Sequence, residues 1–241
     1  MSAEARRARS SGLEVRAPEP DHEVVRRVRR ERAHGTFPSR KAGTGLGGHM
    51  WFAEVERDCM RLLEADPRIV SYRPRPGRLL VTVDGKRHEH RPSFLVSDGA
   101  RKLVLDVVET PRDAAGSPQP LGDPRPDLTA ELRERLRERG FGYQLWTRAR
   151  IRLQPRFGNA CALVRFISVD PRPEDEISAE AAIVAAGGAA PWGAVEAALG
   201  GPDPHARLCA LALAGVVIAD MSVPLSPQTV LRLLPRREVA R

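Results

Sequence analysis

The sequence has few cysteines and lacks long apolar runs. Its three cysteines lie far apart and form no Cys-x-x-Cys pair, which argues against a disulfide framework or a zinc knuckle. No run of about 18 apolar residues occurs, so we expect no membrane-spanning helix. The basic N-terminal stretch lacks an apolar core, so we expect no secretory signal peptide. These absences predict a cytoplasmic protein with no membrane partner.

Lysine is also scarce, although the chain is strongly basic. Only three of its 39 basic residues are lysines, and the formal net charge is +8. A GC-rich genome would explain the preference for arginine, but it does not explain the sign of the charge. The excess favours an anionic partner, with nucleic acid first. Hydrophobic residues make up 41% of the chain, which is enough to bury a core.

The charge is unevenly distributed along the chain, and this predicts the domain organisation. Residues 1–50 carry 11 basic and 6 acidic residues, and residues 51–170 carry 22 and 17. Residues 171–241 carry 6 and 8, and they follow a proline-containing break. The predicted domains are a flexible basic arm over 1–35, a core domain over 36–168 and a helical domain over 171–241.

Apolar periodicity predicts the elements of the core domain. A helix is expected over residues 52–63, followed by four extended runs with a hairpin turn at Asp84-Gly85. Residues 103–108 predict a strand buried on both faces, and a helix over 128–139 and a strand over 141–146 complete the order. The extended runs are 69–73, 79–83, 87–90 and 93–96. This order is typical of a mixed α/β (α+β) domain.

The flanking segments have other patterns. A short helix over 23–32 is expected within the arm, and the glycine-rich residues 35–48 predict a loop. Beyond residue 170, three helices are expected near 174–186, 191–199 and 204–214. Two strands at 216–220 and 229–234 follow. Three helices and a terminal hairpin predict a small winged-helix-like domain.

Two carboxylates fall where the pattern is otherwise apolar. Glu56 projects from the apolar face of the first helix, and Asp106 lies in the most apolar strand. Glu56 is explained by an edge position or a buried ion pair with an arginine, and Asp106 by a solvated sheet edge or strand end. Otherwise the two together form a Mg²⁺ site. Spacing leaves both explanations open. His88 and His90 have no clear third ligand, so a solvated strand is favoured over a zinc site.

Several short motifs follow one another in a recognisable order. Residues 51–58 read Trp-Phe-Ala-Glu-Val-Glu-Arg-Asp and lead to Asp66-Pro67, and Asp84-Gly85 precedes His-Arg-Pro-Ser-Phe at 90–94. Further matches are the strand 103–108, Ile151-Arg152, Asn159 and the lead-in Pro38-Ser39-Arg40-Lys41. Over about residues 36–168 the chain resembles the TnsA-like transposon endonucleases in motif order and spacing. The resemblance implies a restriction-endonuclease-like core.

The resemblance also implies metal-dependent phosphodiester hydrolysis with Mg²⁺ or Mn²⁺. In that family, carboxylates hold the metal and a lysine assists the attacking water. By position, Glu56 and Asp106 match two of the acidic residues. Ser93 stands where the family has its central aspartate, and Val108 stands where it has the lysine. Glu89 shares strand parity with Ser93 and is the best substitute metal ligand.

Three functions remain open on these residues. The first is a subunit of a heteromeric transposase that binds double-stranded DNA at transposon ends and nicks it with metal at Glu56 and Asp106. The second is a nuclease-dead DNA-binding scaffold, favoured by the uncharged Ser93 and Val108. For both, the resemblance implies an integrase-type transposase subunit and an AAA+ ATPase regulator as partners. The third is a nucleic-acid-binding or repair protein unrelated to transposition.

The charge distribution assigns DNA contact to the first two thirds of the chain. The last third lacks a basic surplus, so its winged-helix-like domain is expected to dock protein. The predicted DNA-binding residues are Arg26, Arg27, Arg29, Arg30, Arg32, Arg40 and Lys41.

Overall fold

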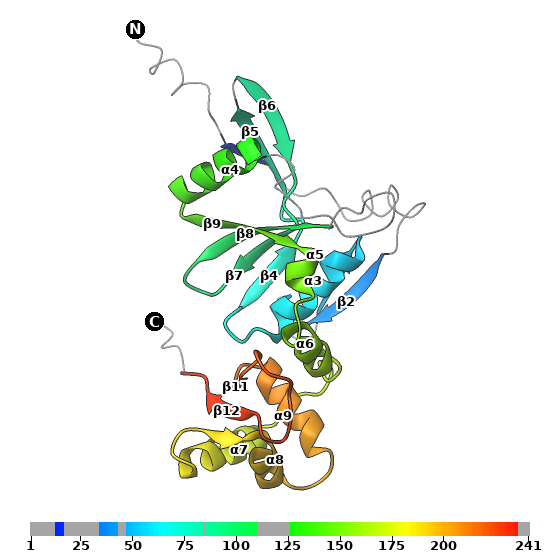
Figure 1. The fold of residues 1–241 in the computed structure, drawn as a ribbon, viewed down its shortest axis with the longest axis vertical. Helices are drawn as coiled ribbons and strands as arrows, with labels where there is room; N and C mark the ends of the chain where they lie inside the picture. The colour runs from blue at the N-terminus through cyan, green and yellow to red at the C-terminus, as the bar shows by residue number, and fades with distance from the viewer. Residues whose placement is uncertain (1–12, 17–33, 43–46, 84, 110–125, 236–241) are drawn as a thin grey trace. The chain divides into compact units, whose positions relative to one another are not determined.

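A computed structural model of the chain describes residues 13–16, 34–42, 47–83, 85–109 and 126–235 (Figure 1). Helices and strands are mixed, as predicted. The chain divides into two compact units. The first unit comprises Met1–Phe37, Gly48–Cys59 and Val70–Ile151, and the second comprises Pro38–Gly47, Met60–Ile69 and Arg152–Arg241. The predicted boundary near residue 170 therefore falls inside the second unit.

A four-stranded sheet with the order β4-β7-β8-β9 forms the centre of the first unit. The strands β4, β7 and β8 are antiparallel, and β9 runs parallel to β8. Their bounds are Ser71–Pro74 for β4, Phe94–Ser97 for β7, Lys102–Val108 for β8 and Phe141–Thr147 for β9. The middle of β8 is buried, as its apolar sequence predicts. A short helix, α5 (Arg148–Ile151), follows β9.

Three further strands form a second sheet in this unit, in the order β1-β5-β6. β5 (Arg78–Val83) and β6 (Lys86–His90) are the predicted hairpin, and Gly85 in their turn has a φ of +77°, which favours glycine. β1 (Leu13–Arg16) pairs with β5, so part of the predicted arm is a strand. The helix expected over 23–32 lies outside the described residues.

The helix α4 (Pro126–Glu138) covers one face of these strands. Its leucines recur every four residues and therefore share one side of the helix. The buried cluster consists of Leu128, Leu132 and Leu136 from α4 with Leu79, Val81 and Val104 from the strands. Side chains of β8 alternate between faces, so Asp106 lies on the same side as Val104 and faces α4.

The first predicted helix is α3 (Glu54–Ala65), whose two halves belong to different units. Two strands precede it, β2 (Gly35–Ser39) and β3 (Gly47–Trp51), and they form a two-stranded sheet where a loop was expected. Glycines fit these two strands because neighbouring groups of β2 and β3 approach each other closely. A Cβ atom on Gly48 would lie 2.7 Å from Cγ2 of Thr36.

The second unit contains the three predicted helices and the terminal hairpin. Its strands β10, β11 and β12 form an antiparallel sheet in the order β10-β12-β11. The elements in chain order are α6 (Arg156–Val164), α7 (Pro173–Ala185), β10 (Ala190–Pro191), α8 (Trp192–Leu199), α9 (Pro204–Leu213), β11 (Val217–Ala219) and β12 (Val230–Leu233). Among the described residues, no helix is long and apolar enough to cross a bilayer.

The helix α9 lies at the centre of this unit. Every residue from Arg207 to Leu213 is buried, and α6, α7, α8 and β11 all pack against the helix. The α6 residue Asn159 joins the segment before β12 to this core, because its side-chain amide donates to the carbonyl of Val223 and accepts from the backbone N–H of Leu225. These contacts explain why residues before 170 belong to the second unit.

Candidate functional site

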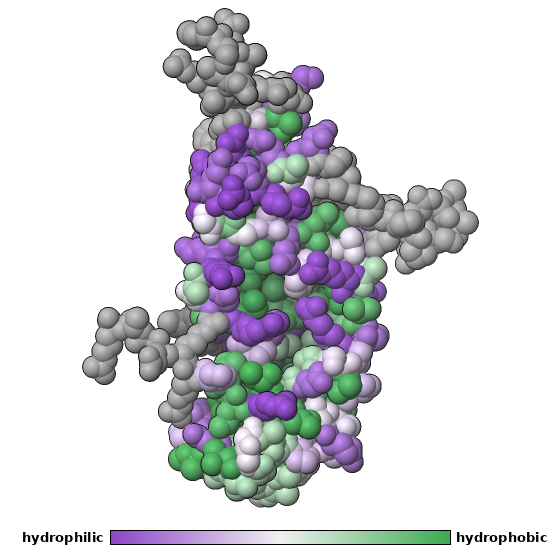
Figure 2. Space-filling model, turned by 60° about the vertical axis from the view of Figure 1, so that its left-hand side comes forward, coloured by the Kyte–Doolittle hydropathy of each residue, from purple (hydrophilic) through white to green (hydrophobic). Residues whose placement is uncertain are grey.

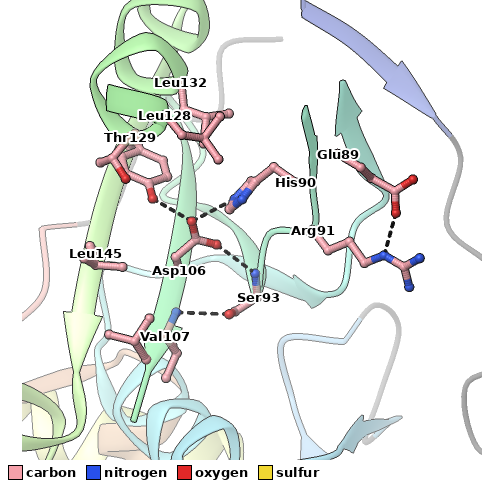
Figure 3. A pocket seen from close by; sticks show the side chains of 12 residues that line it. Glu89, His90, Arg91, Ser93, Asp106, Val107, Leu128, Thr129, Leu132 and Leu145 are labelled. Carbon is pink, nitrogen blue, oxygen red and sulfur yellow. Dashed lines mark hydrogen bonds and ion pairs between the residues drawn. The ribbon is translucent and has the colours of Figure 1, made fainter. Parts of the chain in front are cut away.

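Asp106 is held in place by three groups from the first unit (Figure 3). The Tyr143 hydroxyl on β9 donates to Oδ2 at 2.6 Å, and the Ser93 backbone N–H donates to Oδ1 at 3.2 Å. The Nε2 atom of His90 lies 2.8 Å from Oδ2 and forms an ion pair when the imidazole is protonated. Asp106 is only 6% exposed, so these contacts replace the water that a buried carboxylate would otherwise lack.

A cavity of about 340 Å³ opens beside this cluster. One wall is apolar and comes from α4 and β9, and the other is polar and comes from β6 and the start of β7 (Figure 3). The lining residues include Leu128, Leu132 and Leu145 on the first wall, and Glu89, His90, Arg91 and Ser93 on the second. Asp106 and Val108 lie between them on β8. Three of the predicted site positions, Ser93, Asp106 and Val108, therefore line one cavity.

Ser93 has a structural function at the position of the expected aspartate. Its Oγ atom accepts a hydrogen bond from the backbone N–H of Val107 at 3.0 Å, and its own N–H donates to Asp106. Its carbonyl accepts from the N–H of Arg75 at 2.9 Å. Ser93 thus ties the start of β7 to β8 with neutral groups, and it brings no negative charge to the cavity. Val108, at the lysine position, brings no donor.

Glu56 does not line this cavity. Its Oε2 atom accepts from the backbone N–H of Phe52 at 2.7 Å, which closes the first turn of α3. Its Oε1 atom lies 3.4 Å from Nη2 of Arg75, whose guanidinium stacks over the Phe52 ring with 4.0 Å between Cζ and the ring centroid. Pairing with an arginine was one of the two explanations that spacing left open. The two predicted metal carboxylates are therefore each bound to protein groups.

Glu89 lies on the rim of the cavity and binds two arginines. Its Oε1 atom accepts from Nε of Arg91 at 2.9 Å, and its Oε2 atom lies 3.3 Å from Nη1 of Arg78. The hydrogen bond from Arg91 is the main cause that lowers the pKa of Glu89. No group of three or more His, Cys, Asp or Glu side chains within the described residues is arranged to hold a metal ion.

These side chains do not fit a divalent cation. Mg²⁺ needs carboxylate oxygens with free lone pairs in an octahedral arrangement. In the cavity, Asp106 accepts from Tyr143 and Ser93, Glu89 pairs with two arginines, and the other implied positions are the uncharged Ser93 and Val108. The arrangement is a polar cluster beside a small cavity, in which Tyr143 and Ser93 hydrogen-bond Asp106 and His90 lies at ion-pair distance from it. It can fix the strands and shape a surface, but it lacks the second acidic ligand and the lysine of the implied chemistry.

Two of the predicted DNA-binding residues are described, and both bind groups within the second unit. The Lys41 ammonium donates to the carbonyls of Leu63 and Asp66 at 2.8 and 2.6 Å, at the C-terminal end of α3. Burial lowers the pKa of Lys41 to about 8, although Glu64 and Asp66 act to raise it. Lys41 is thus buried and engaged at the end of α3, and its DNA contact stays a prediction.

Arg40 is similarly engaged, with Nε donating to the carbonyl of Ile167 at 2.8 Å and Nη2 donating to that of Val169 at 2.6 Å. Its own backbone N–H donates to Glu64 at 2.7 Å, and the Ser39 hydroxyl donates to the same carboxylate. The basic lead-in Pro38-Ser39-Arg40-Lys41 therefore packs on the C-terminal end of α3. The other predicted residues, Arg26, Arg27, Arg29, Arg30 and Arg32, lie outside the described residues.

Sequence reasoning missed two members of the Asp106 cluster. A solvated strand is expected at His90, but the residue is buried and contacts Asp106. The alternation of β5 and β6 was the available signal, because His90 pairs with the apolar Leu79 and His88 pairs with the apolar Val81. Tyr143 gave no local signal, because its hydroxyl meets a residue 37 positions away.

Comparisons with known proteins add no family to this geometry. No protein-family model matches the chain, and no curated protein matches it.

Proposed function

We propose that this chain is a DNA-binding scaffold subunit of the TnsA-like type, which holds DNA without cleaving it. The observation that carries this proposal is the Asp106 cluster. The carboxylate expected to bind metal is occupied by Tyr143, His90 and the Ser93 N–H, and the two partner positions are the uncharged Ser93 and Val108. The resemblance to the TnsA-like endonucleases is the reason for proposing a DNA-binding subunit. The groups around Asp106 and the uncharged Ser93 and Val108 are the reason for proposing a scaffold and not a nuclease.

The architecture of the first unit supports the TnsA-like assignment. Its order of helix, strands, helix and strand (α3, β4–β8, α4, β9) is the order that the resemblance implies for a restriction-endonuclease-like core. The mixed sheet places β8, with Asp106, between an antiparallel and a parallel neighbour. Three of the four implied active-site positions, Ser93, Asp106 and Val108, thus line one cavity, and the fourth, Glu56, does not.

The second unit supports a role in protein contact. Its order α7-β10-α8-α9-β11-β12, with the sheet order β10-β12-β11, supports our proposal of a winged-helix-like domain. A DNA-reading domain of the helix-turn-helix class inserts one helix into the major groove. Here the corresponding helix, α9, is buried, and its one arginine binds Asp175. The implied integrase-type transposase subunit and AAA+ ATPase regulator are the partners we propose.

The test combines binding and cleavage by the full chain. Fluorescence anisotropy with a labelled duplex is measured over a salt series, in EDTA and in Mg²⁺, and nicking of a supercoiled plasmid is followed with Mg²⁺ or Mn²⁺. We expect affinity to fall steeply with salt, to be equal with and without metal, and no nicks to form. Metal-dependent nicking that disappears in Asp106→Asn would contradict the scaffold and establish a nuclease. Absence of duplex binding would contradict the DNA-binding class altogether.

A further inference from the structure

The positive charge of the first unit is concentrated around one hairpin. Residues 71–97, from β4 to β7, contain six basic and two acidic residues, whereas residues 51–70 contain three and five. Hydrophilic side chains gather in Figure 2 at the height where Figure 1 places α4 and the β5–β6 hairpin. A segment this short with this surplus produces a locally positive surface.

The strand register brings these cations to one face of the hairpin. Leu80 pairs with Glu89 and Thr82 pairs with Arg87, so residues 78, 80 and 82 of β5 share a face with 87 and 89 of β6, and Arg91 follows in the same alternation. The other face carries Leu79 and Val81, which pack on α4. We call Arg78, Arg87, Glu89 and Arg91 the hairpin face. The backbone of β1 adds one acidic and one basic position to this side, with Glu14 in register with Leu80 and Arg16 in register with Arg78.

Glu89 occupies the middle of the hairpin face. Its carboxylate contacts Arg78 on the neighbouring strand and Arg91 two residues along, and the Arg78, Glu89 and Arg91 side chains are 22%, 38% and 46% exposed. One carboxylate therefore faces two guanidinium groups. Guanidinium groups bind carboxylates and phosphates with the same forked geometry, so this arrangement is also suited to a phosphate.

The cations of α4 are balanced differently. Arg137 pairs with Glu134, and Arg135 pairs with Glu131 and Glu138, all within the helix at spacings of three or four residues. The helix carries three basic and four acidic residues over Pro126–Glu138. Its charges are satisfied locally and leave no surplus for an anion. On β5 and β6 the hairpin face has three arginines and one acid, and β1 adds one residue of each sign, so this face keeps a net positive charge.

We propose that the hairpin face is the surface through which the first unit contacts the phosphodiester backbone of double-stranded DNA, and that Glu89 occupies the place of a phosphate until DNA displaces it. This inference rests on the proposed DNA-binding function. It moves the DNA-binding surface from the lead-in at Arg40 and Lys41 to β5 and β6. It also places the DNA backbone at the rim of the Asp106 cavity, because Glu89 and Arg91 line both.

The test measures duplex affinity of full-length variants by anisotropy over a salt series. Arg87→Ala/Arg91→Ala removes two phosphate-binding groups, and each phosphate that is no longer neutralised should lower the slope of log affinity against log salt by about one. Glu89→Gln keeps the shape but removes the competing charge, so it should bind the duplex severalfold more tightly than the wild type at low salt. The matched controls on and beside α4 are Arg137→Ala/Arg139→Ala and Glu134→Gln, which should bind like the wild type.

The outcomes separate the two proposals. If the wild type binds and the hairpin variants match the α4 controls, the hairpin face is wrong while the DNA-binding function stands. If Glu89→Gln binds more weakly than the wild type, the phosphate-mimic role of Glu89 is wrong. If the wild type shows no salt-dependent binding, both proposals fall. Unchanged midpoints of thermal unfolding establish that the exposed substitutions leave the fold intact.

Discussion

The hairpin face of the first unit and the cations of the second unit use the same residue types in opposite ways. Arg87 and Arg91 are exposed, and Arg78 and Arg91 share one carboxylate. Arg207 and Lys41 are buried, and their donors end on backbone carbonyls and on Asp175. Net charge counts all of these cations equally. The comparison shows that the location of a cation, rather than the number of cations, decides whether it faces a partner or holds the chain together.

Removing Arg207 should cause the largest loss of stability. Its guanidinium donates to Asp175 and to the carbonyls of Gly200 and Pro202, which joins α7, α9 and the loop before α9. Arg207→Met leaves the buried Asp175 without its cation, which should lower the free energy of unfolding by about 3–5 kcal/mol. The loss in the free energy of unfolding is measured by urea unfolding, monitored by circular dichroism. The exposed Arg232→Met on β12 is the control, and equal losses in both variants would refute the structural role.

The second largest effect should be a dependence of stability on pH, caused by Lys41. Its pKa is about 8 in the folded chain and returns to its ordinary, higher value on unfolding, so the unfolded chain binds more protons between these values. Stability should therefore rise as the pH increases above about 8, by roughly 3 kcal/mol at most from this residue. Urea unfolding across that range measures the slope. Lys41→Met should make the dependence of stability on pH less steep than Lys102→Met, which is the exposed control. Identical slopes in the two variants would show that Lys41 is not the enclosed ammonium that causes the dependence.

A smaller effect is expected at the Asp106 cluster. Tyr143→Phe removes the hydroxyl that donates to Asp106 at 2.6 Å, and a hydrogen bond to a charged group contributes about 2 kcal/mol. The unfolding midpoint in urea should fall accordingly, while duplex affinity stays at the wild-type value. A loss of DNA binding without a loss of stability would mean that Tyr143 contacts DNA instead of supporting the sheet.

The smallest change in stability is expected on the hairpin face. Arg91→Ala breaks an exposed pair with Glu89, and such pairs contribute little, so the free energy of unfolding should change by less than about 0.5 kcal/mol. The same variant should weaken duplex binding. Differential scanning calorimetry gives the first quantity and anisotropy the second. A destabilisation comparable to that of Arg207→Met would remove the distinction between the two regions.

Much of the fold was predictable from the sequence because its signals are local. Helical spacing of apolar residues predicted α3 and α4, and Asp84-Gly85 between alternating strands predicted the β5–β6 hairpin. The strands β2 and β3 were not predicted, because their glycines are typical of loops. Their pairing depends on side chains from the facing strand, such as Thr36 against Gly48.

The candidate site was predictable only in part. Glu56 and Asp106 could be singled out from the sequence because they are carboxylates among apolar residues. A buried carboxylate needs a paired or hydrogen-bonded group, so a partner for each was expected. Which partner each has could not be read from the sequence, since Arg75 and Tyr143 approach through the tertiary fold. For the same reason the sequence does not reveal that Lys41 is enclosed at the end of α3.

The most direct test of the scaffold is a calorimetric titration of the full-length wild type with Mn²⁺, beside Asp106→Asn. The Asp106 oxygens are already engaged by Tyr143 and Ser93, so we expect no saturable heat that depends on Asp106, and identical traces for both proteins. Stoichiometric Mn²⁺ binding to the wild type that Asp106→Asn abolishes would contradict this, because it would show a metal centre where we propose a polar cluster that stabilises the sheet.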